Sequence, residues 1–165
     1  MIIIGYQAIG KSTLSGQFHR WLDLESTNTW FEENGERKRW PNWAEIYVNF
    51  AVDLSANQRY NVFVSSHREV RLELMKHVQD TRIIVCCPSL ELKDQWIERL
   101  QRRYDKSGLD KDYRALMNAK DCYTENIQEL MESGFPVIQI TSMKYELSML
   151  IENGAGPAID GFYGR

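Results

Sequence analysis

The stretch Met1-Ile2-Ile3-Ile4-Gly5-Tyr6-Gln7-Ala8-Ile9-Gly10-Lys11-Ser12 decides the fold of this chain. From Gly5 onward it matches the pattern G-x-x-x-x-G-K-[ST] at every fixed position. Average residue usage gives only about 0.01 chance matches in a chain of this length. The β-branched run before Gly5 predicts a buried strand, and the residues from Lys11 to about Arg20 predict a helix. A strand, this pattern and a helix in direct succession predict a phosphate-binding loop.

The residue types in this loop suit a phosphate chain and a metal ion. Gly5 and Gly10 allow backbone angles that turn successive N–H groups inward, and the helix that follows directs the positive end of its dipole at the same place. Lys11 supplies a mobile cation for the β- and γ-phosphates, and the Ser12 hydroxyl can ligate Mg²⁺. We therefore predict that ATP and Mg²⁺ bind through these loop residues: Gly5, Gln7, Ala8, Ile9, Gly10, Lys11, Ser12 and Thr13.

Elsewhere, short apolar runs alternate with stretches of helical spacing. Strands are expected at residues 22–24, 60–64, 82–87 and 135–140, and helices at 42–54, 69–77, 90–104, 113–132 and 143–151. Residues 25–41 read as a polar, aromatic-rich loop with Gly35 in a turn, and the tail from Gly154 is expected to be poorly ordered. Short apolar strands between helices predict a three-layer α/β fold, a P-loop domain whose parallel sheet of four to five strands is covered on both faces.

Composition limits the class of protein. The 165 residues suffice for one domain with its own core, and a content of 43% apolar and 26% charged residues excludes a disordered chain. A net charge of -3 argues against a dedicated duplex-DNA binder. No apolar run is long enough to span a membrane. The three cysteines form neither a disulfide framework nor a zinc motif, and no leader peptide is evident, so a cytoplasmic location is expected.

Two large classes of nucleotide-binding protein fit poorly. A GTPase needs the guanine-reading pattern Asn-Lys-x-Asp after a strand, whereas this chain has Asn118-Ala119-Lys120-Asp121 inside an expected helix. A motor ATPase has an apolar strand that ends in an acid, whereas the strand at 60–64 is followed by Ser65-Ser66-His67-Arg68. The acid that would assist a metal ion must therefore come from elsewhere in the chain.

The chain resembles the small P-loop kinases of the nucleoside and nucleoside-monophosphate kinase superfamily. It is most similar in pattern to small nucleotide-kinase-like ATP-binding proteins encoded by bacteriophages. Besides the loop, the stretches that carry this resemblance are Asp23-Leu24-Glu25-Ser26-Thr27, Trp40-Pro41-Asn42-Trp43, residues 64–71 (VSSHREVR) and Glu91-Leu92-Lys93. The resemblance implies a single kinase-like domain over residues 1–165 that transfers a phosphoryl group from ATP, with Mg²⁺, to a nucleotide or nucleoside. For a phage protein, the compartment would be the host cytoplasm.

The same resemblance implies an acceptor-binding insertion at about residues 25–57 and a lid-like region at about 90–114. In the insertion, Trp30 and Trp40 are candidates for stacking a base, whereas Trp43 and Tyr47 are expected in the core. In the lid, arginines would neutralise the transferring phosphoryl group. The candidates are Arg99, Arg102 and Arg103, which share one side of a helix by spacing, and also Arg114.

Polar residues that follow the strands complete the expected site, because ligands of open α/β sheets bind beyond the carboxyl ends of the strands. Asp23 or Glu25 is the candidate for the missing acid, as a partner of Ser12 in holding Mg²⁺ or as the base that accepts a hydroxyl proton. The resemblance carries a catalytic glutamate to Glu25, and it implies that Arg68 grips a phosphate. His67 and the serines before it are secondary candidates.

Three functions remain open at this level. The chain is a nucleotide or nucleoside kinase, or a kinase of another small hydroxyl compound or of a polynucleotide end. Alternatively, it is an ATP-binding regulatory or interaction protein with weak hydrolysis. The acceptor and the oligomeric state are not encoded in any motif.

Overall fold

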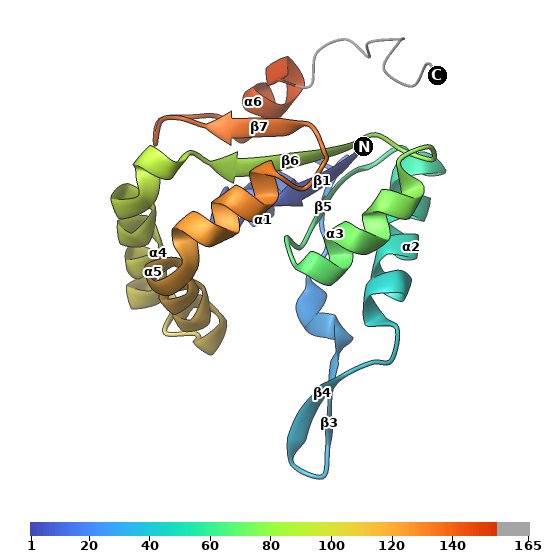
Figure 1. Ribbon diagram of the computed structural model, residues 1–165, viewed down its shortest axis with the longest axis horizontal. Coiled ribbons are helices and arrows are strands. Elements are labelled where there is room, and N and C mark those ends of the chain that lie inside the picture. Colours follow the sequence, from blue (N-terminus) through green and yellow to red (C-terminus); the bar gives the residue numbers. More distant parts are fainter. Residues whose placement is uncertain (155–165) are drawn as a thin grey trace.

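A central parallel sheet organises the protein, and the computed structural model describes residues 1–154. All pairings within this sheet are parallel, so the carboxyl ends of its strands meet at one edge (Figure 1). In spatial order the strands are β2 (Trp21–Asp23), β5 (Asn61–Val64), β1 (Ile2–Gly5), β6 (Ile83–Pro88) and β7 (Val137–Ile140).

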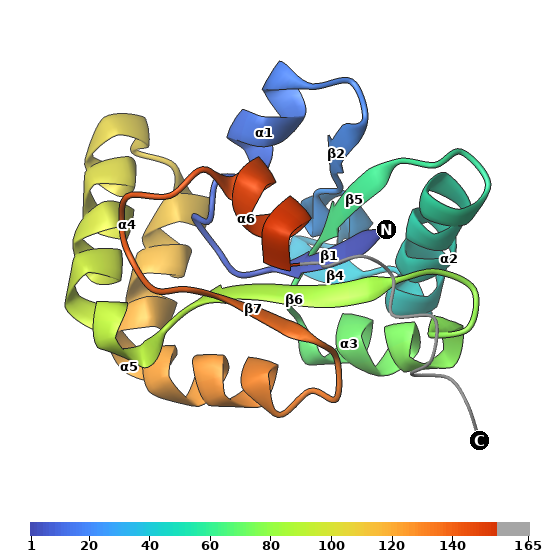
Figure 2. The same cartoon turned by 90° about the horizontal axis from the view of Figure 1, so that it is seen from above.

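Helices cover both faces of the sheet. Those described are α1 (Lys11–Gln17), α2 (Trp43–Ala56), α3 (Arg68–Leu74), α4 (Lys93–Ser107), α5 (Asp110–Met131) and α6 (Leu147–Gly154), with short 3-10 turns η1 (Ser26–Thr29), η2 (Met75–His77) and η3 (Leu90–Leu92). α1 and α6 lie on one face, and α3 and the end of α5 lie on the other (Figure 2). This arrangement confirms the predicted α/β class and the helix-flanked parallel sheet.

The core explains why the first strand reads as a continuous apolar run. Ile2, Ile3 and Ile4 are each 0% exposed, because β1 is the central strand and its two faces both meet helices. Ile3 pairs with Phe63 of β5 on one side and with Ile84 of β6 on the other. Burial on both faces requires apolar residues at successive positions rather than at alternate ones.

Residues 25–41 are not an irregular loop, so that expectation was wrong. They contain the hairpin formed by β3 (Trp30–Glu33) and β4 (Glu36–Arg39), which projects from the sheet (Figure 1). Asn34 and Gly35 connect the strands with φ of 54° and 75°. Two successive left-handed residues form the tight turn whose twist matches an antiparallel pair, and Asn-Gly is its preferred sequence.

Helices α4 and α5 pack against each other as an antiparallel pair joined at Gly108, whose φ of 63° ends α4. α5 is interrupted at Cys122, where φ is -130°, so its two halves run in different directions. We call α4 together with residues 110–121 the arm, which stands beside the carboxyl edge of the sheet (Figure 1). α5 begins earlier than its predicted start at Tyr113, because Asp110 and Asp112 suit the first turn of a helix.

Two remaining expectations concern the C-terminal part. α6 begins at Leu147 rather than Met143, because Tyr145 lies in a non-helical segment that contacts the loop after β1. The predicted disorder of the tail concerns residues 155–165, which lie outside the described part of the chain. No helix within residues 1–154 is long and apolar enough to cross a membrane.

Candidate functional site

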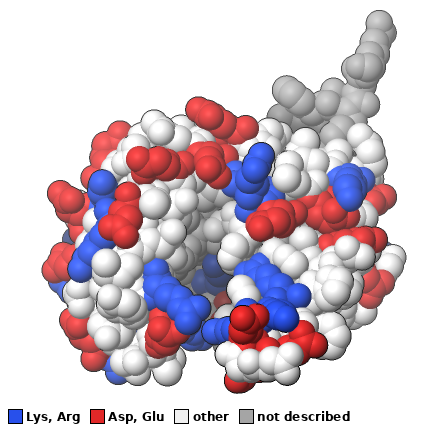
Figure 3. Space-filling view, turned by 60° about the horizontal axis from the view of Figure 1, so that its bottom comes forward, with Lys and Arg blue, Asp and Glu red and all other residues white. Residues whose placement is uncertain are grey.

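A cleft of about 1360 Å³ opens at the carboxyl edge of the sheet. Its floor is the loop that joins β1 to α1, and its walls come from the segment after β2, the β5–α3 junction, the hairpin and the arm. Figure 3 shows Lys and Arg side chains gathered around this hollow. The elements that the sequence predicted to converge therefore do meet at one place.

The Gly5–Thr13 loop has the backbone expected of an anion-binding turn. Ala8 and Gly10 both take left-handed angles, with φ of 62° and 102°. Alternation of left- and right-handed residues turns neighbouring N–H groups toward a common point. Of the loop residues predicted to bind, Ile9 is the exception, because it is 1% exposed and does not line the cleft.

Lys11 folds back over the loop. Its Nζ donates hydrogen bonds to the carbonyl oxygens of Gly5 at 2.9 Å and Tyr6 at 3.3 Å. A Cβ at Gly5 would lie 2.7 Å from Cδ of Lys11, so a larger residue there would displace the lysine. Burial lowers the pKa of Lys11, and the nearby carboxylates of Asp23 and Glu25 act in the opposite direction.

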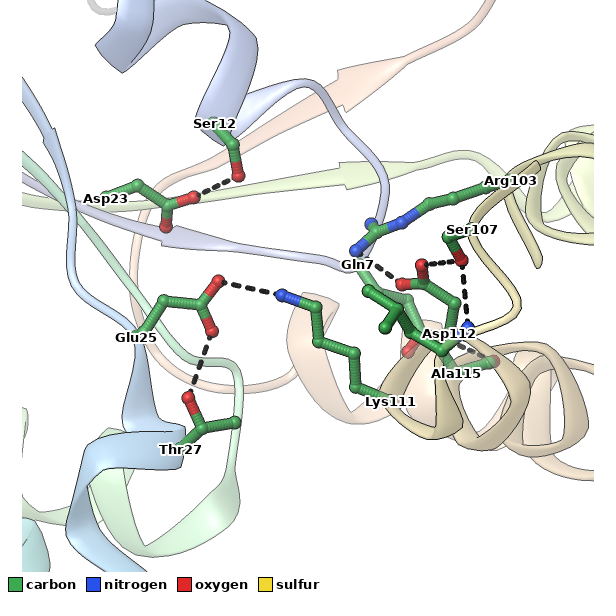
Figure 4. Close-up of polar contacts among 11 residues, drawn as sticks. Gln7, Ser12, Asp23, Glu25, Thr27, Arg103, Ser107, Lys111, Asp112 and Ala115 are labelled. Atoms are coloured by element: carbon green, nitrogen blue, oxygen red, sulfur yellow. Dashed lines mark hydrogen bonds and ion pairs between the residues drawn. The ribbon is translucent and has the colours of Figure 1, made fainter.

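The two candidate acids occupy different places. Asp23 ends β2, and its Oδ2 accepts a hydrogen bond from Ser12 Oγ at 2.6 Å (Figure 4). Glu25 instead points across the cleft, where its Oε1 lies 3.6 Å from Lys111 Nζ in the arm. Its other oxygen accepts from Thr27 at 3.4 Å. The carboxylate beside the Ser12 hydroxyl is therefore that of Asp23.

The pair of Ser12 and Asp23 matches what Mg²⁺ requires. This ion prefers oxygen ligands and is usually held by one or two side chains, together with waters and substrate phosphates. A hydroxyl and a carboxylate 2.6 Å apart at the base of the cleft provide such a pair. Within residues 1–154, no group of three or more His, Cys, Asp or Glu side chains is placed to hold a metal ion.

The cleft is cationic although the chain carries a net charge of -3. Among the described residues, four with carboxylate side chains line the cleft: Asp23, Glu25, Asp110 and Glu129. Nine cations line it: Lys11, Arg37, Arg39, Arg68, Arg71, Arg99, Arg103, Lys111 and Arg114. Low-dielectric walls lined by one sign of charge concentrate the field, so this cleft favours anionic ligands.

Several of these cations were not among the predicted site residues. Arg37 and Arg39 reach the cleft because β4 is a strand of a hairpin, and the Asn34-Gly35 pair was the signal that would have placed them. Arg71 lies one helical turn after Arg68 on α3, and it is held by Glu129 through Oε2 at 2.6 Å and the carbonyl oxygen at 2.8 Å.

Arg39 is fixed between two tryptophans. Its guanidinium carbon lies 4.6 Å from the ring centroid of Trp30 and 3.7 Å from that of Trp43. The guanidinium carbon of Arg37 also lies 5.3 Å from the ring centroid of Trp30. The Trp30 ring therefore contacts two arginines and is not free to stack on a base. Trp40 does not line the cleft and packs on Phe31 with ring centroids 5.2 Å apart.

Tyr47 and His67 both lie near the carboxyl end of β5, one buried beneath the cleft edge and the other lining the cleft. Tyr47 is buried, and its hydroxyl donates to the Leu24 carbonyl at 2.6 Å and accepts from the Ser65 N–H at 3.0 Å. His67 lines the cleft, with its Nδ1 against Ser65 Oγ. Partial burial lowers the pKa of His67, and Arg39 acts in the same direction.

The three arginines of α4 do not act as one group, contrary to the expectation from their spacing. Arg99 and Arg103 line the cleft, whereas Arg102 faces away and pairs with Glu98 at 2.5 Å. Arg103 lies 2.6 Å from the buried carboxylate of Asp112, whose other oxygen accepts from Ser107 at 2.5 Å (Figure 4). The contact with Arg103 is an ion pair rather than a well-directed hydrogen bond.

The arm thus presents Arg99, Arg103, Lys111 and Arg114 to the cleft, while Asp110 lies 2.5 Å from Arg114 and partly neutralises its charge.

No protein-family model, curated protein or solved structure matches the chain. The chemistry of the site therefore has to be inferred from its own geometry and charges.

Proposed function

We propose that this protein is an ATP- and Mg²⁺-dependent phosphotransferase of the P-loop kinase type, and that its acceptor is a nucleotide. The observation that carries the proposal is a complete G-x-x-x-x-G-K-[ST] loop at the floor of a cleft lined by nine cations. The expected assignment as a phage-type nucleotide kinase is part of this proposal.

The donor side uses the loop. Backbone N–H groups of the Gly5–Thr13 loop would surround the phosphates of ATP, and Lys11 would leave its carbonyl partners to follow the β- and γ-phosphates. Ser12 and Asp23 would hold Mg²⁺, which neutralises charge on those phosphates. Phosphoryl transfer depends mostly on such positioning and charge stabilisation, so no covalent protein intermediate is required.

The acceptor side favours a substrate that already carries a phosphate. Arg37, Arg39, Arg68 and Arg71 converge from the hairpin and α3 onto one wall of the cleft. Guanidinium groups bind phosphate oxygens in pairs and keep their charge at all physiological pH values. A neutral nucleoside offers no anion to this wall, where only Arg71 has a carboxylate partner among the contacts described above, so a nucleoside monophosphate fits better than a nucleoside.

Glu25 is the proposed carboxylate on the acceptor side. It follows β2, faces the space between the loop and the arm, and would orient the acceptor phosphate through Lys111. If the acceptor were a hydroxyl compound instead, Glu25 would be the base that accepts its proton.

The acceptor can be identified by transfer of label from γ-labelled ATP. We expect label on nucleoside monophosphates and much less on nucleosides or on oligonucleotides with 5′-hydroxyl ends. Arg68→Ala should reduce transfer to monophosphates by about tenfold or more, because a charge-assisted bond is lost. Arg20→Ala, an exposed arginine that does not line the cleft, is the matched control and should leave transfer unchanged.

Other outcomes of the same screen would favour the other functions. Label on oligonucleotide ends would identify a polynucleotide kinase. Release of free phosphate without any labelled acceptor would identify an ATP-binding regulatory protein with weak hydrolysis. No ATP binding at all would exclude the whole proposal.

A further inference from the structure

Side chains outside the cleft hold two carbonyl groups of the Gly5–Thr13 loop. Trp96, which is 0% exposed in α4, donates from Nε1 to the Gln7 carbonyl oxygen at 3.0 Å. The Tyr145 hydroxyl, from the segment before α6, donates to the Ile9 carbonyl oxygen at 2.9 Å. The same hydroxyl accepts a hydrogen bond from Arg99 Nη1 at 2.9 Å.

These bonds determine where the loop N–H groups point. In a trans peptide the C=O of one residue and the N–H of the next are directed oppositely. When Trp96 holds the Gln7 carbonyl, the Ala8 N–H is therefore turned away from Trp96. When Tyr145 holds the Ile9 carbonyl, the Gly10 N–H is likewise turned away from Tyr145. Ala8 and Gly10 both line the cleft.

We propose that Tyr145 is a positioning residue that fixes the anion-binding geometry of the loop, and that Arg99 acts on the loop through Tyr145 rather than by touching the reacting phosphoryl group. This inference rests on the proposed function, because it assumes that the loop binds the phosphates of ATP. It changes the role that the resemblance implied for Arg99, from a lid arginine to a support of the loop.

The surroundings of Arg99 favour this role. Its guanidinium carbon lies 5.1 Å from the ring centroid of Trp96 and 5.3 Å from that of Tyr145, so both supports of the loop flank it. Burial raises the pKa of Tyr145, and the phenol therefore remains a donor to Ile9 at neutral pH. A hydroxyl that accepts from a cation is a stronger donor, so Arg99 strengthens the bond to the loop.

The arrangement also links the loop to the arm. Trp96 and Arg99 both belong to α4, and Tyr145 precedes α6, so elements far apart in sequence meet behind the loop. A ligand that orders the loop would in turn fix α4 through these contacts. Arg103 and Lys111 of the arm are then presented to a bound phosphate chain.

The test is a double-mutant cycle read by ATP affinity and by steady-state kinetics. Tyr145→Phe removes the hydroxyl and keeps the ring, and we expect ATP to bind about five- to tenfold more weakly, the effect of losing one or two hydrogen bonds. The effect should fall on KM for ATP more than on kcat. Arg99→Ala should weaken binding by a smaller factor, about threefold, and should have no further effect in the Tyr145→Phe background.

The matched control is Tyr113→Phe, an exposed tyrosine of α5 that does not line the cleft. It should bind ATP like the original chain, and melting temperatures report whether each variant folds. Should Tyr145→Phe not fold, Arg99→Gln tests the same relay, by which we mean the path from Arg99 through the Tyr145 hydroxyl to the loop, without altering the tyrosine. It should likewise raise KM for ATP more than it lowers kcat.

The relay is overturned if Tyr145→Phe binds ATP as tightly as the original chain. It is also overturned if Arg99→Ala lowers kcat by the same factor with and without the Tyr145 hydroxyl, because that is the behaviour of a lid arginine. An original chain that does not bind ATP would instead overturn the proposed function, and the relay with it.

Discussion

The ammonium group of Lys11 donates hydrogen bonds within its own loop, to the carbonyl oxygens of Gly5 and Tyr6. Burial lowers its pKa below the ordinary 10.5, so the ammonium group loses its proton at a lower pH than a free lysine does. ATP affinity should therefore fall as pH rises through that lowered pKa, and the decline should begin at a lower pH than for a free lysine.

Lys11→Arg supplies the control for this pH dependence. A guanidinium stays charged throughout the range, so the variant should lose the alkaline decline even if its affinity at pH 7 is lower. Titration of ATP binding between about pH 7 and 10 measures the difference. An identical decline in both chains would assign the pH effect to another group.

The two acids near Ser12 lead to a second prediction at this scale. Asp23→Asn should raise the Mg²⁺ concentration needed for half-maximal turnover and lower kcat by at least about tenfold, because the metal loses a charged ligand. Glu25→Gln should lower kcat without changing the Mg²⁺ requirement, since Glu25 faces Lys111 instead. Turnover measured against Mg²⁺ concentration separates the two variants. Equal Mg²⁺ dependence in both would contradict the assignment.

Sequence alone could not choose between Asp23 and Glu25, and the reason is local. They are two residues apart, so both follow the same short strand. The choice depends on the pairing of β2 with β5, where Asp23 lies opposite Phe63, and on the path of the chain into η1. By contrast, the strand, turn and helix around the loop could be predicted, because the pattern combines residue types that have few other uses together. Of the loop residues predicted to bind, only Ile9 does not line the cleft.

At the scale of elements, the strands of the main sheet were predictable and the hairpin was not. β1, β6 and residues 62–64 of β5 are continuously apolar, which only burial on both faces requires. β3 and β4 are largely exposed and charged, so they carry no apolar alternation. Their only signal was the turn at Asn34 and Gly35.

That turn can be tested with a pair of glycine substitutions. Gly35→Ala places a side chain at φ of 75° and should cost about 1 kcal/mol of local stability. We expect amide hydrogen exchange in residues 30–39 to quicken by about fivefold, since that free energy corresponds to such a factor. Gly16→Ala, which has nothing within 4 Å of the new Cβ and an ordinary helical position, should leave the hairpin unchanged and slow exchange in α1. Unchanged exchange in the Gly35→Ala hairpin would contradict the turn geometry.

The arm depends on a buried acid that no pattern in the sequence singled out. The side chain of Asp112 is 4% exposed and has Arg103 and Ser107 as partners. Arg103→Ala leaves this carboxylate with one partner, so we expect a loss of about 1–3 kcal/mol in the free energy of unfolding. Arg102→Ala removes only an exposed pair with Glu98 and should change stability by less than about 1 kcal/mol.

Thermal melting of the two variants measures this difference. The melting temperature of Arg103→Ala should fall by at least about 3 °C relative to Arg102→Ala. Adding Asp112→Asn to Arg103→Ala should recover part of the loss, because the unpaired charge is removed. Equal melting temperatures for the two single variants would show that Asp112 does not need Arg103.

At the scale of the whole molecule, charge is distributed unevenly. The chain has more acidic than basic residues, yet nine cations and only four carboxylates line the described cleft. Figure 3 shows many of the other Asp and Glu side chains on the surface around it. Overall composition therefore could not reveal the cleft. Its cations come from the loop, the hairpin, α3 and the arm, which only the tertiary fold brings together.

The measurement that tests the central claim most directly is equilibrium binding of ATP with Mg²⁺ to the original chain and to Lys11→Ala. Lys76→Ala is the matched control, because Lys76 is an exposed lysine of η2 outside the cleft. We expect the original chain and Lys76→Ala to bind ATP equally well, and Lys11→Ala to bind at least about tenfold more weakly while keeping its melting temperature, since it loses a charge-assisted contact to the phosphates. If Lys11→Ala binds ATP as tightly as the original chain, the Gly5–Thr13 loop is not a phosphate-binding loop.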